Sequence, residues 1–433
     1  MTSSSENIVY VNEFVDLVGP ETEMLGPVKD GGRIVTGTEA ACYGPMITPE
    51  VESGHTISRP VAVEGAEVGD AVALKIKNIR ITSKASASGT ETPREGSFDG
   101  DPFVAKKCPG CGKINPNTVV EGVGRDAICC ADCGSSVSAF DVTNGYTMVF
   151  DDNRTVGVTV PNHVAQEIAR NAGDYSGAPA GSGCHSILVF ALADMPAGIV
   201  SKIRPMIGNL GTLPGVTMPS SHNAGDFGVF LIDAPHNHAI TEEDLTQRTD
   251  AHMDIDSIGE GAIVIAPVKV EQAGIIVGDV HAMQGDGEIA GHTTDVSAEV
   301  TVEVEVIKNL ANDGPILLPL MENLPPLARL PSSEELETAR SLAGRSGFDI
   351  QTDVAPFQVV GSGANLNEAT MNGLERMAKL ADMDIDEVKN RVTITGGIEI
   401  GRLPGVVHIS MLTPLSRLKQ LGIAHLVTEQ YGL

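Results

Sequence analysis

Tryptophan is absent from these 433 residues, aromatic side chains make up only 3%, and basic residues are scarce. Lys and Arg number 29 against 57 Asp and Glu, which gives a formal charge of −28. Nucleic acids and anionic membrane surfaces attract clustered Lys and Arg, so this charge argues against both classes of partner. An acidic surface can mark a high-salt cytoplasm, but solubility explains it more simply.

Long apolar runs are also missing. No stretch approaches the roughly 20 apolar residues that a membrane-spanning helix needs. The first residues lack the basic segment and apolar run of a secretory signal. We therefore expect a soluble, cytoplasmic protein. Hydrophobic residues make up 42% of the chain, which is enough for a sizeable core built from Val, Ile, Leu and Ala.

Cysteine is rare but clustered, because five of the seven cysteines fall between residues 108 and 133. Cys108 and Cys111 form one CxxC motif, Cys130 and Cys133 form a second, and 18 residues separate them. This spacing is typical of a zinc ribbon, and four thiolates leave no open coordination position, so a structural zinc ion is predicted. Another metal, or unliganded cysteines, are the alternatives. Cys129 is expected to be a spare thiol.

Strands dominate the first three-quarters of the chain. They are expected over 61–81, 186–192, 261–280 and 296–307. In the last segment, Val and Ala at every second position alternate with Ser, Thr and Glu, which predicts one packed face and one wet face. Helices are expected between about 332 and 390, where Ser332 precedes an acidic first turn and apolar residues between 365 and 382 follow a helical spacing.

These patterns predict an α+β, β-rich fold. We expect a β-sandwich or barrel-like core, a smaller C-terminal helical section and an inserted zinc ribbon. The predicted division is an N-terminal β part of the core at 1–100, the ribbon at 101–140, a β-rich catalytic core at 141–320 and a C-terminal α+β section at 321–433.

A second concentration of polar residues follows the strand expected to end near residue 280. Asp279 and His281 are two positions apart, so an extended segment points both to one face. A carboxylate and an imidazole there are metal ligands or an acid/base pair. Asp286 and Glu288 add two carboxylates on a glycine-containing turn. Turn-forming Asp and solvent-facing Glu are the alternative interpretation. The same i, i+2 spacing recurs upstream at Asp250, His252 and Asp254.

The stretch from His252 to Glu288 resembles the acetamidase/formamidase family, whose Gly-Asp-x-His-x-x-Gln-Gly-Asp-Gly-Glu block stands here at 278–288. Residues 55–70, 205–211 and 365–369 also resemble segments of that family. The chain departs from the family where His252 replaces Asn and where Asp250-Ala251 replaces Gly-Gly. It also departs over 215–238, which carries His222, His236 and His238; the last two are expected at the surface.

The resemblance implies hydrolysis of the C–N bond of a small, formamide- or acetamide-like amide to a carboxylate and ammonia. We also expect a homo-oligomer. Because no Gly-x-Ser-x-Gly elbow appears, water activated by a divalent ion, expected to be zinc, fits the His and Asp residues better than a side-chain nucleophile. The ligands expected at this ion are His55, His252, Asp254, Asp279 and His281. The other site residues expected are Glu288 as general base with Asp286 and His281 in catalysis, and Gln284, Gly208 and Asn209 in substrate binding.

Several alternatives stay open. Cys184 beside His185 could imitate a nucleophile and its base, although adjacent strand residues point to opposite faces. His55 could merely hydrogen-bond across a strand end. At the level of function, the alternatives are a metal-dependent hydrolase of another C–N bond, such as a cyclic or substituted amide or a carbamate, a non-catalytic metal- or ligand-binding module, and a zinc-ribbon interaction protein.

Overall fold

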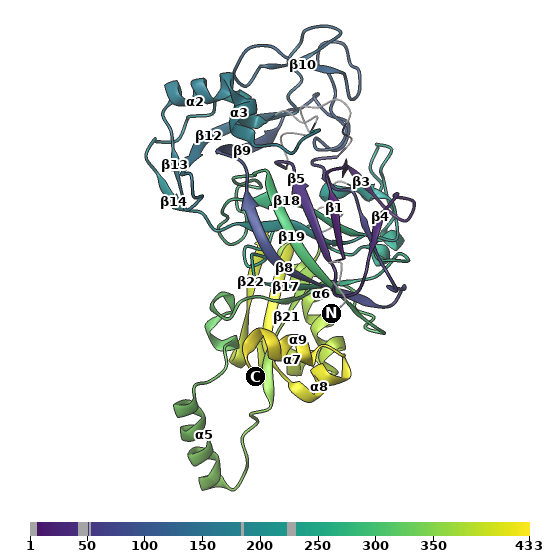
Figure 1. Ribbon diagram of the computed structural model, residues 1–433, viewed down its shortest axis with the longest axis vertical. Coiled ribbons are helices and arrows are strands. Elements are labelled where there is room, and N and C mark those ends of the chain that lie inside the picture. The colour runs from purple at the N-terminus through teal and green to yellow at the C-terminus, as the bar shows by residue number, and fades with distance from the viewer. Residues whose placement is uncertain (1–6, 42–50, 52, 183–185, 223–230) are drawn as a thin grey trace, which may run out of the picture.

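Three tiers make up the molecule in the computed structural model, which describes residues 7–41, 51, 53–182, 186–222 and 231–433. Figure 1 shows an upper lobe, a β-rich middle and a lower part that carries the C-terminal helices, with one helix projecting from the bottom. No helix within the described ranges is long and apolar enough to cross a membrane. The β-rich class with a C-terminal helical section is confirmed.

A nine-stranded sheet runs through the middle and lower parts. Its order is β1 (Ile8–Val11), β5 (Arg33–Thr38), β19 (Ala298–Ile307), β8 (Ala71–Ile81), β17 (Ile263–Pro267), β20 (Ile316–Leu318), β21 (Val354–Ser362), β23 (Val406–Pro414) and β22 (Gly396–Arg402). In β19, Val300, Val302 and Val304 are buried while the alternate side chains are half-buried, so the strand predicted from period-two alternation is confirmed. Strands from the predicted segments 1–100, 141–320 and 321–433 share this sheet.

A second sheet packs on one face of the first. Its order is β2 (Phe14–Val15), β6 (Ile57–Ser58), β18 (Ile275–His281), β7 (Val61–Val63) and β4 (Leu25–Val28), and β15 (Met206–Thr212) also pairs with β18. One apolar cluster contains Val302 and Leu74 from the first sheet together with Ile57 and Ile276 from the second. Every residue of β15 and β18 is buried, so polar side chains on these strands need partners or an ion.

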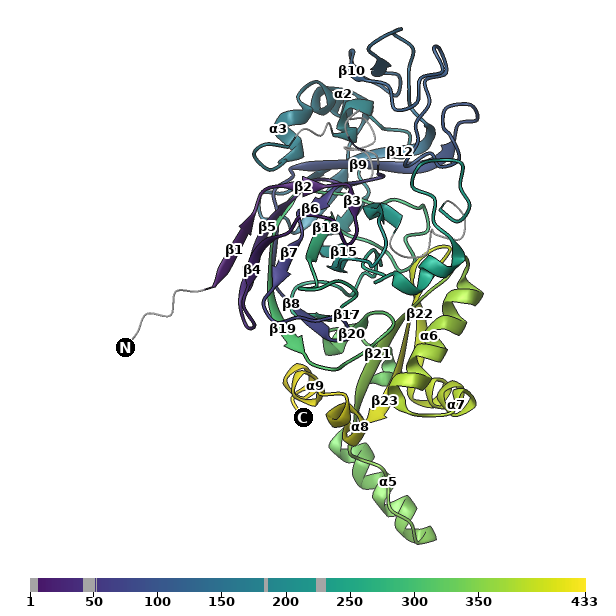
Figure 2. The same ribbon diagram turned by 90° about the vertical axis from the view of Figure 1, so that its right-hand side faces the viewer.

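The C-terminal helices cover the other part of the long sheet (Figure 2). They are α6 (Leu366–Ala381), α7 (Ile385–Thr395), α8 (Leu415–Gln420) and α9 (Ala424–Tyr431), whereas α5 (Ser333–Ser346) projects away from the sheet. Ser332 caps α5 with a capping box, as its position before the acidic first turn predicted, and Asn365 caps α6. The segment 332–390 is not continuously helical, because the wholly buried strand β21 interrupts it.

The upper lobe contains a four-stranded sheet ordered β14 (Val200–Lys202), β13 (Val156–Thr159), β12 (Phe140–Phe150) and β9 (Ala85–Pro93), plus the hairpin β10 (Thr118–Val120) and β11 (Ile128–Cys130). Helices α2 (Asn162–Arg170) and α3 (Ala172–Ser176) lie beside it. The strand predicted at 186–192 is wrong: Ile187–Phe190 is a buried 3-10 turn, η1, that ends where Ala191 adopts φ 52°. An apolar run specifies burial and leaves the backbone type open.

Candidate active site

The candidate site lies where strands β15 and β18 meet the loops of the middle tier. Asn209 pairs with Gly278 and Met206 with His281 across these strands. Isolated bridges attach the loops: Asn209 to His252, His281 to Asp295, and Gly287 to Arg402. Segments separated by up to 347 positions, His55 to Arg402 (402 − 55), thereby reach one place.

The backbone at the site is unusual. Asp254, Asp279 and Glu288 have φ values of 50°, 56° and 41°, in the left-handed region that non-glycine residues seldom adopt. Such conformations cost free energy and persist where the surrounding structure imposes them, often at functional sites. All three were predicted site residues. Asp279 and His281 were predicted to share one face of a regular extended strand. The positive φ of Asp279 departs from that regular strand, but the two side chains still contact each other.

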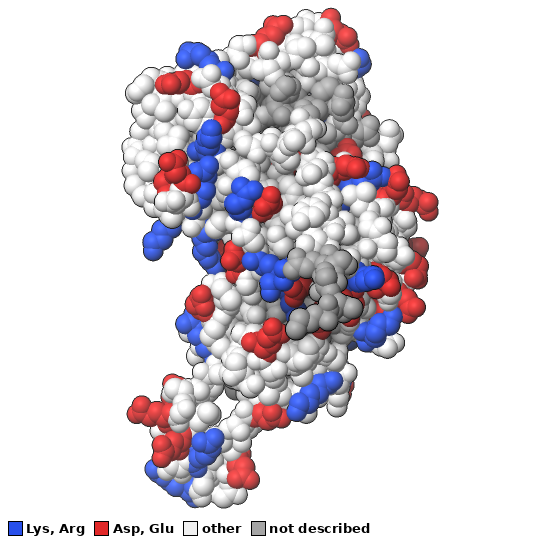
Figure 3. Space-filling view, viewed as in Figure 1, with Lys and Arg blue, Asp and Glu red and all other residues white. Residues whose placement is uncertain are grey.

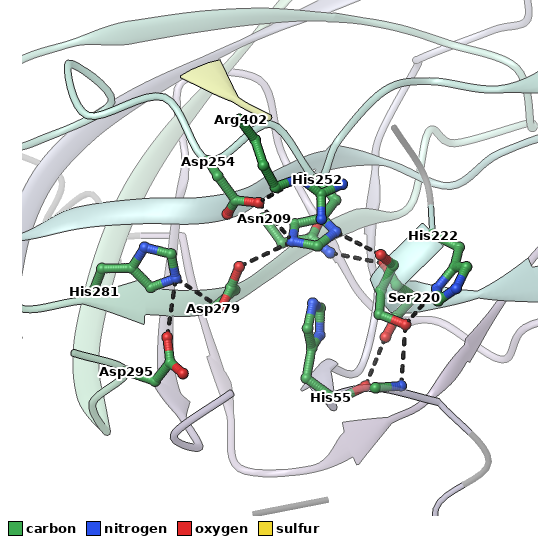
Figure 4. A network of polar contacts seen from close by, with 12 residues as sticks. His55, Asn209, Ser220, His222, His252, Asp254, Asp279, His281, Asp295 and Arg402 are labelled. Carbon is green, nitrogen blue, oxygen red and sulfur yellow. Dashed lines mark hydrogen bonds and ion pairs between the residues drawn. The ribbon is translucent and has the colours of Figure 1, made fainter. Parts of the chain in front are cut away.

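Asp279 lies between two histidines, each of which contacts one of its carboxylate oxygens (Figure 4). His252 Nε2 is 3.1 Å from Asp279 Oδ2 and 3.0 Å from Asp254 Oδ2. His281 Nε2 is 3.0 Å from Asp279 Oδ1 and 3.2 Å from Asp295 Oδ1. All five residues are buried, so three carboxylates converge in a medium where an uncompensated charge is costly.

Burial and these charges act against each other at His252. Burial alone would lower its pKa, but Asp254 and Asp279 outweigh burial and raise the pKa to about 10. His252 Nδ1 lies 2.6 Å from the carbonyl oxygen of Ser221, which can only accept, so Nδ1 donates and Nε2 faces the carboxylates. The negative potential that raises this pKa also attracts a cation.

His55 is fully buried, and neither of its ring nitrogens has a hydrogen-bond partner among the described residues. Its ring meets the ring of His252 edge-on, with centroids 4.8 Å apart, and stands among the other site groups in Figure 4. Burial lowers the pKa of His55 to about 3, so the imidazole is neutral, which is the form that binds metals. Among the described residues, neither nitrogen therefore forms the hydrogen bond across a strand end that was the alternative for His55.

Glu288 is buried beside the cluster, whereas Asp286 on the same turn is exposed. Burial and the charge of Asp254 raise the pKa of Glu288 well above its usual range. Partial burial and the charge of Asp256 raise the pKa of Asp286, and the charge of Arg204 opposes them. The structure therefore brings Glu288 to the cluster and places Asp286 at the surface.

The three predicted substrate-binding residues surround the same cluster. Gln284 Oε1 lies 2.8 Å from His281 Nδ1, and Asn209 Nδ2 donates to the Ser220 carbonyl at 3.0 Å. A Cβ on Gly208 would lie 2.3 Å from both Asp254 Oδ1 and Asp279 Oδ2. Only glycine fits at that position.

Sequence reasoning missed three contributors to the site. Asp295 follows His281 by 14 positions without a recognisable motif, Arg402 Nε lies 3.1 Å from Asp254 Oδ2, and Ser221 supplies the carbonyl for His252 from the segment 215–238 that matched no family pattern. His222 in that segment is buried, while His236 and His238 are half-buried. Cys184 and His185 lie outside the described residues.

Metal-ligand geometry recurs in three overlapping groups whose ligand atoms lie within 4.8 Å of one another: His55 with His252 and Asp279; Asp254 with His281 and Glu288; and Asp279 with His281 and Asp295. Several buried atoms of these groups accept or donate no hydrogen bond among the described residues: both His55 nitrogens, Asp254 Oδ1 and Asp295 Oδ2. Imidazole and carboxylate ligands suit zinc and related divalent ions, so the residues fit such an ion.

The four predicted cysteines also meet. Sulfur atoms of Cys108 and Cys133 are 3.5 Å apart, and those of Cys111 and Cys130 are 3.9 Å apart. Each CxxC turn ends in a glycine of positive φ whose amide donates to the carbonyl of the first cysteine. Cys129 Sγ instead lies 3.5 Å from the Asp126 carbonyl, as expected for a spare thiol. The four-cysteine cluster could hold one metal ion.

Comparison with known proteins gives a consistent result. The model described as "Acetamidase/Formamidase family" matches residues 31–415. A Schizosaccharomyces pombe protein named "Putative formamidase" is 35% identical over 71 residues, which span 15% of this chain and 17% of that protein.

Solved structures share the fold at low identity. A predicted acetamidase/formamidase from Thermoanaerobacter tengcongensis is 18% identical, with a TM-score of 0.53 over 96% of this chain and 98% of that one. An acetamidase from Bacillus halodurans is also 18% identical, with a TM-score of 0.51 over 96% and 99% of the two chains.

Proposed function

Because the chain belongs to the acetamidase/formamidase family, we propose that it hydrolyses the C–N bond of a small, formamide- or acetamide-like amide to a carboxylate and ammonia. One observation carries this proposal: His55, His252, Asp279 and His281 converge from distant segments in a buried site. Groups of this kind are expensive to bury without an ion or a reaction to serve.

The proposed resident group at this site is a divalent ion, zinc by preference. His55, His252, Asp254, Asp279 and His281 would hold it together with Asp295, whose Oδ1 lies 3.2 Å from His281 Nε2. When bound, such an ion polarises a carbonyl oxygen and lowers the pKa of water. The unpartnered nitrogens of His55 support this assignment, because a buried neutral imidazole otherwise forgoes its hydrogen bonds.

The chain's own residues supply orientation and proton transfer. The Ser221 carbonyl holds the His252 ring with Nε2 inward, and Gln284 holds His281 through Nδ1. Arg402 balances the charge of Asp254. Glu288 is the proposed proton carrier: as a carboxylate it takes a proton from the water that adds to the carbonyl carbon, and it gives that proton to the amide nitrogen, which leaves as ammonia when the C–N bond breaks.

The four-cysteine cluster is proposed to bind a structural zinc ion. Its ligands are Cys108, Cys111, Cys130 and Cys133, all thiolates, which close a tetrahedral shell and leave no position for a substrate. The two matching turns support this assignment, since their backbone bonds hold each cysteine pair in place.

We further propose a cytoplasmic homo-oligomer. The helix α5 projects from the body. Leu342 in this helix and Phe348 just after it are 63% and 60% exposed.

On the face in Figure 3, Lys and Arg lie interspersed with Asp and Glu, which does not favour a polyanionic partner.

The test is ammonia release across a panel of small amides, including formamide, acetamide, a cyclic amide and a carbamate, with metal analysis of the same sample. We expect release from the short primary amides and more than one metal ion per chain. Release only from the cyclic amide or the carbamate would assign another C–N hydrolase, and no release from any of them would favour a non-catalytic binding protein.

A further inference from the structure

Two buried histidines of the middle tier each contact a carboxylate of the upper lobe. His222 Nε2 lies 2.6 Å from Asp101 Oδ2, and the two side chains are 1% and 0% exposed. His292 Nε2 lies 2.7 Å from Glu91 Oε2, and both side chains are 4% exposed. Polar contacts this dry are costly to break, because removal of one partner leaves the other buried and uncompensated.

Both histidines stand on the segments that build the site. His222 ends the 3-10 turn η2 (Ser220–His222), whose Ser221 carbonyl accepts from His252 Nδ1 at 2.6 Å. The Ser221 hydroxyl lies 2.7 Å from His222 Nδ1. A chain of contacts thus runs from Asp101 through His222 and Ser221 to His252.

The second pair contacts the segment that carries Glu288 and Asp295. His292 follows Glu288 by four positions and precedes Asp295 by three, and Glu91 belongs to β9 of the lobe sheet. Phe103 of the lobe lies between the two pairs, with ring centroids 6.3 Å from His222 and 5.9 Å from His292. Its ring also packs on Phe140 of β12 at 4.9 Å.

We propose that Asp101 and Glu91 are positioning residues of the upper lobe. Asp101 holds the segment of Ser221, whose carbonyl accepts from His252, and Glu91 holds the segment of Glu288. This inference rests on the proposed function. The lobe then contributes to the amidase site by fixing the orientation of the metal ligand His252 and of the proton carrier Glu288. Replacement of partners behind a metal ligand typically costs 10–100-fold in metal affinity or activity.

The experiment compares Asp101→Asn and Glu91→Gln with Asp141→Asn. Asp141 is an exposed lobe carboxylate that pairs with Arg94 inside the lobe and is therefore the matched control. Metal-stripped proteins are titrated with Co²⁺, and thiolate-to-cobalt absorption separates binding at the cysteines from binding at the His/carboxylate site. We expect Asp101→Asn and Glu91→Gln each to weaken cobalt binding at the His/carboxylate site about 10–100-fold. Cobalt binding at the cysteines should be unchanged, kcat should fall and KM should change little.

A double variant distinguishes positioning from general destabilisation. Asp101→Asn combined with His222→Gln should lose no more cobalt affinity than the worse single variant, because both changes break the same link. Full additivity of the two losses, or parental cobalt affinity in Asp101→Asn and Glu91→Gln, would overturn the proposal.

Hydrogen exchange keeps the test independent of activity. Amides of 218–222 and 286–295 should exchange faster in the Asp101 and Glu91 variants, respectively, than in Asp141→Asn; equal exchange would overturn the proposal. If the parent protein binds cobalt at the cysteines alone and releases no ammonia, the proposed function fails, and the exchange rates still decide whether the lobe positions these segments.

Discussion

At the scale of single residues, the two carboxylates of the Gly278–Glu288 block differ sharply in environment. Glu288 is buried beside Asp254 and His281, and Asp286 is exposed. Replacing Glu288 with Gln removes the proton carrier but keeps the volume, so we expect kcat to fall about 10²–10⁴-fold with metal content unchanged. Asp279→Asn should lower metal content as well as activity. Parental ammonia release by Glu288→Gln would refute the assignment, and Asp286→Asn, expected to lose less, shows the effect of an exposed neighbour.

Gly208 is constrained by the carboxylates around it. The Cβ of Gly208→Ala would lie 2.3 Å from an oxygen of Asp254 and from one of Asp279, so these groups must move apart. We expect loss of active-site metal and a stability cost of about 1–3 kcal/mol, measured by metal analysis and urea unfolding. Gly285→Ala is the control, because a Cβ there meets nothing within 4 Å. Equal metal content in the two variants would contradict the account.

His408 in β23 links stability to pH. Burial lowers its pKa to about 4, below the ordinary value near 6.5, so the folded protein holds the neutral form. The unfolded chain takes up a proton first as pH falls, and this group should cost about 2 kcal/mol of unfolding free energy between pH 7.5 and pH 5. This contribution to the free energy of unfolding is present above pH 6.5 and is lost as the pH falls below that value. His408→Met should show a smaller decrease in urea unfolding over that range; an equal decrease would show that other groups dominate.

At the scale of elements, the two CxxC turns form a cross-link between chain segments of the lobe. Cys108→Ser with Cys111→Ser should remove one zinc ion per chain and lower the unfolding temperature, because metal binding contributes folding free energy. Cys129→Ser is the control, since the sulfur of Cys129 faces Asp126, and it should keep the zinc. Metal analysis and calorimetry measure both effects. Unchanged zinc in the double variant would show that another site holds the ion.

At the scale of the whole molecule, the projecting α5 is the feature that a second copy would best explain. Its exposed apolar residues should pack in an assembly, so Leu342→Asp with Phe348→Asp is expected to reduce the mass measured by light scattering to that of smaller species. Thr338→Asp, on the same helix and exposed, should leave the mass unchanged. A parent protein of 45.2 kDa in solution would rule out the homo-oligomer.

Much of this molecule is predictable from local patterns. The alternation over 296–307, the helix cap at Ser332 and the double CxxC spacing each encode their geometry within a few residues, because side-chain periodicity and capping are local properties. The residues of the Gly278–Glu288 block offered metal ligands or an acid/base pair by their types alone, and the amide chemistry came from the family resemblance. The run 186–192 was misassigned because apolarity alone does not distinguish a strand from a buried turn.

The tertiary structure decided what is assembled around those residues. Asp295, Arg402 and the Ser221 carbonyl reach the site through non-local strand pairing and bridges, which no spacing in the sequence records. The same holds for Asp101 and Glu91, which meet His222 and His292 across 121 and 201 positions of sequence (222 − 101 and 292 − 91). By itself the sequence determined which groups could bind a metal and which segments could pack. Burial and long-range pairing determined which carboxylates lost water, and therefore which of them, Glu288 rather than Asp286, stands beside the histidines.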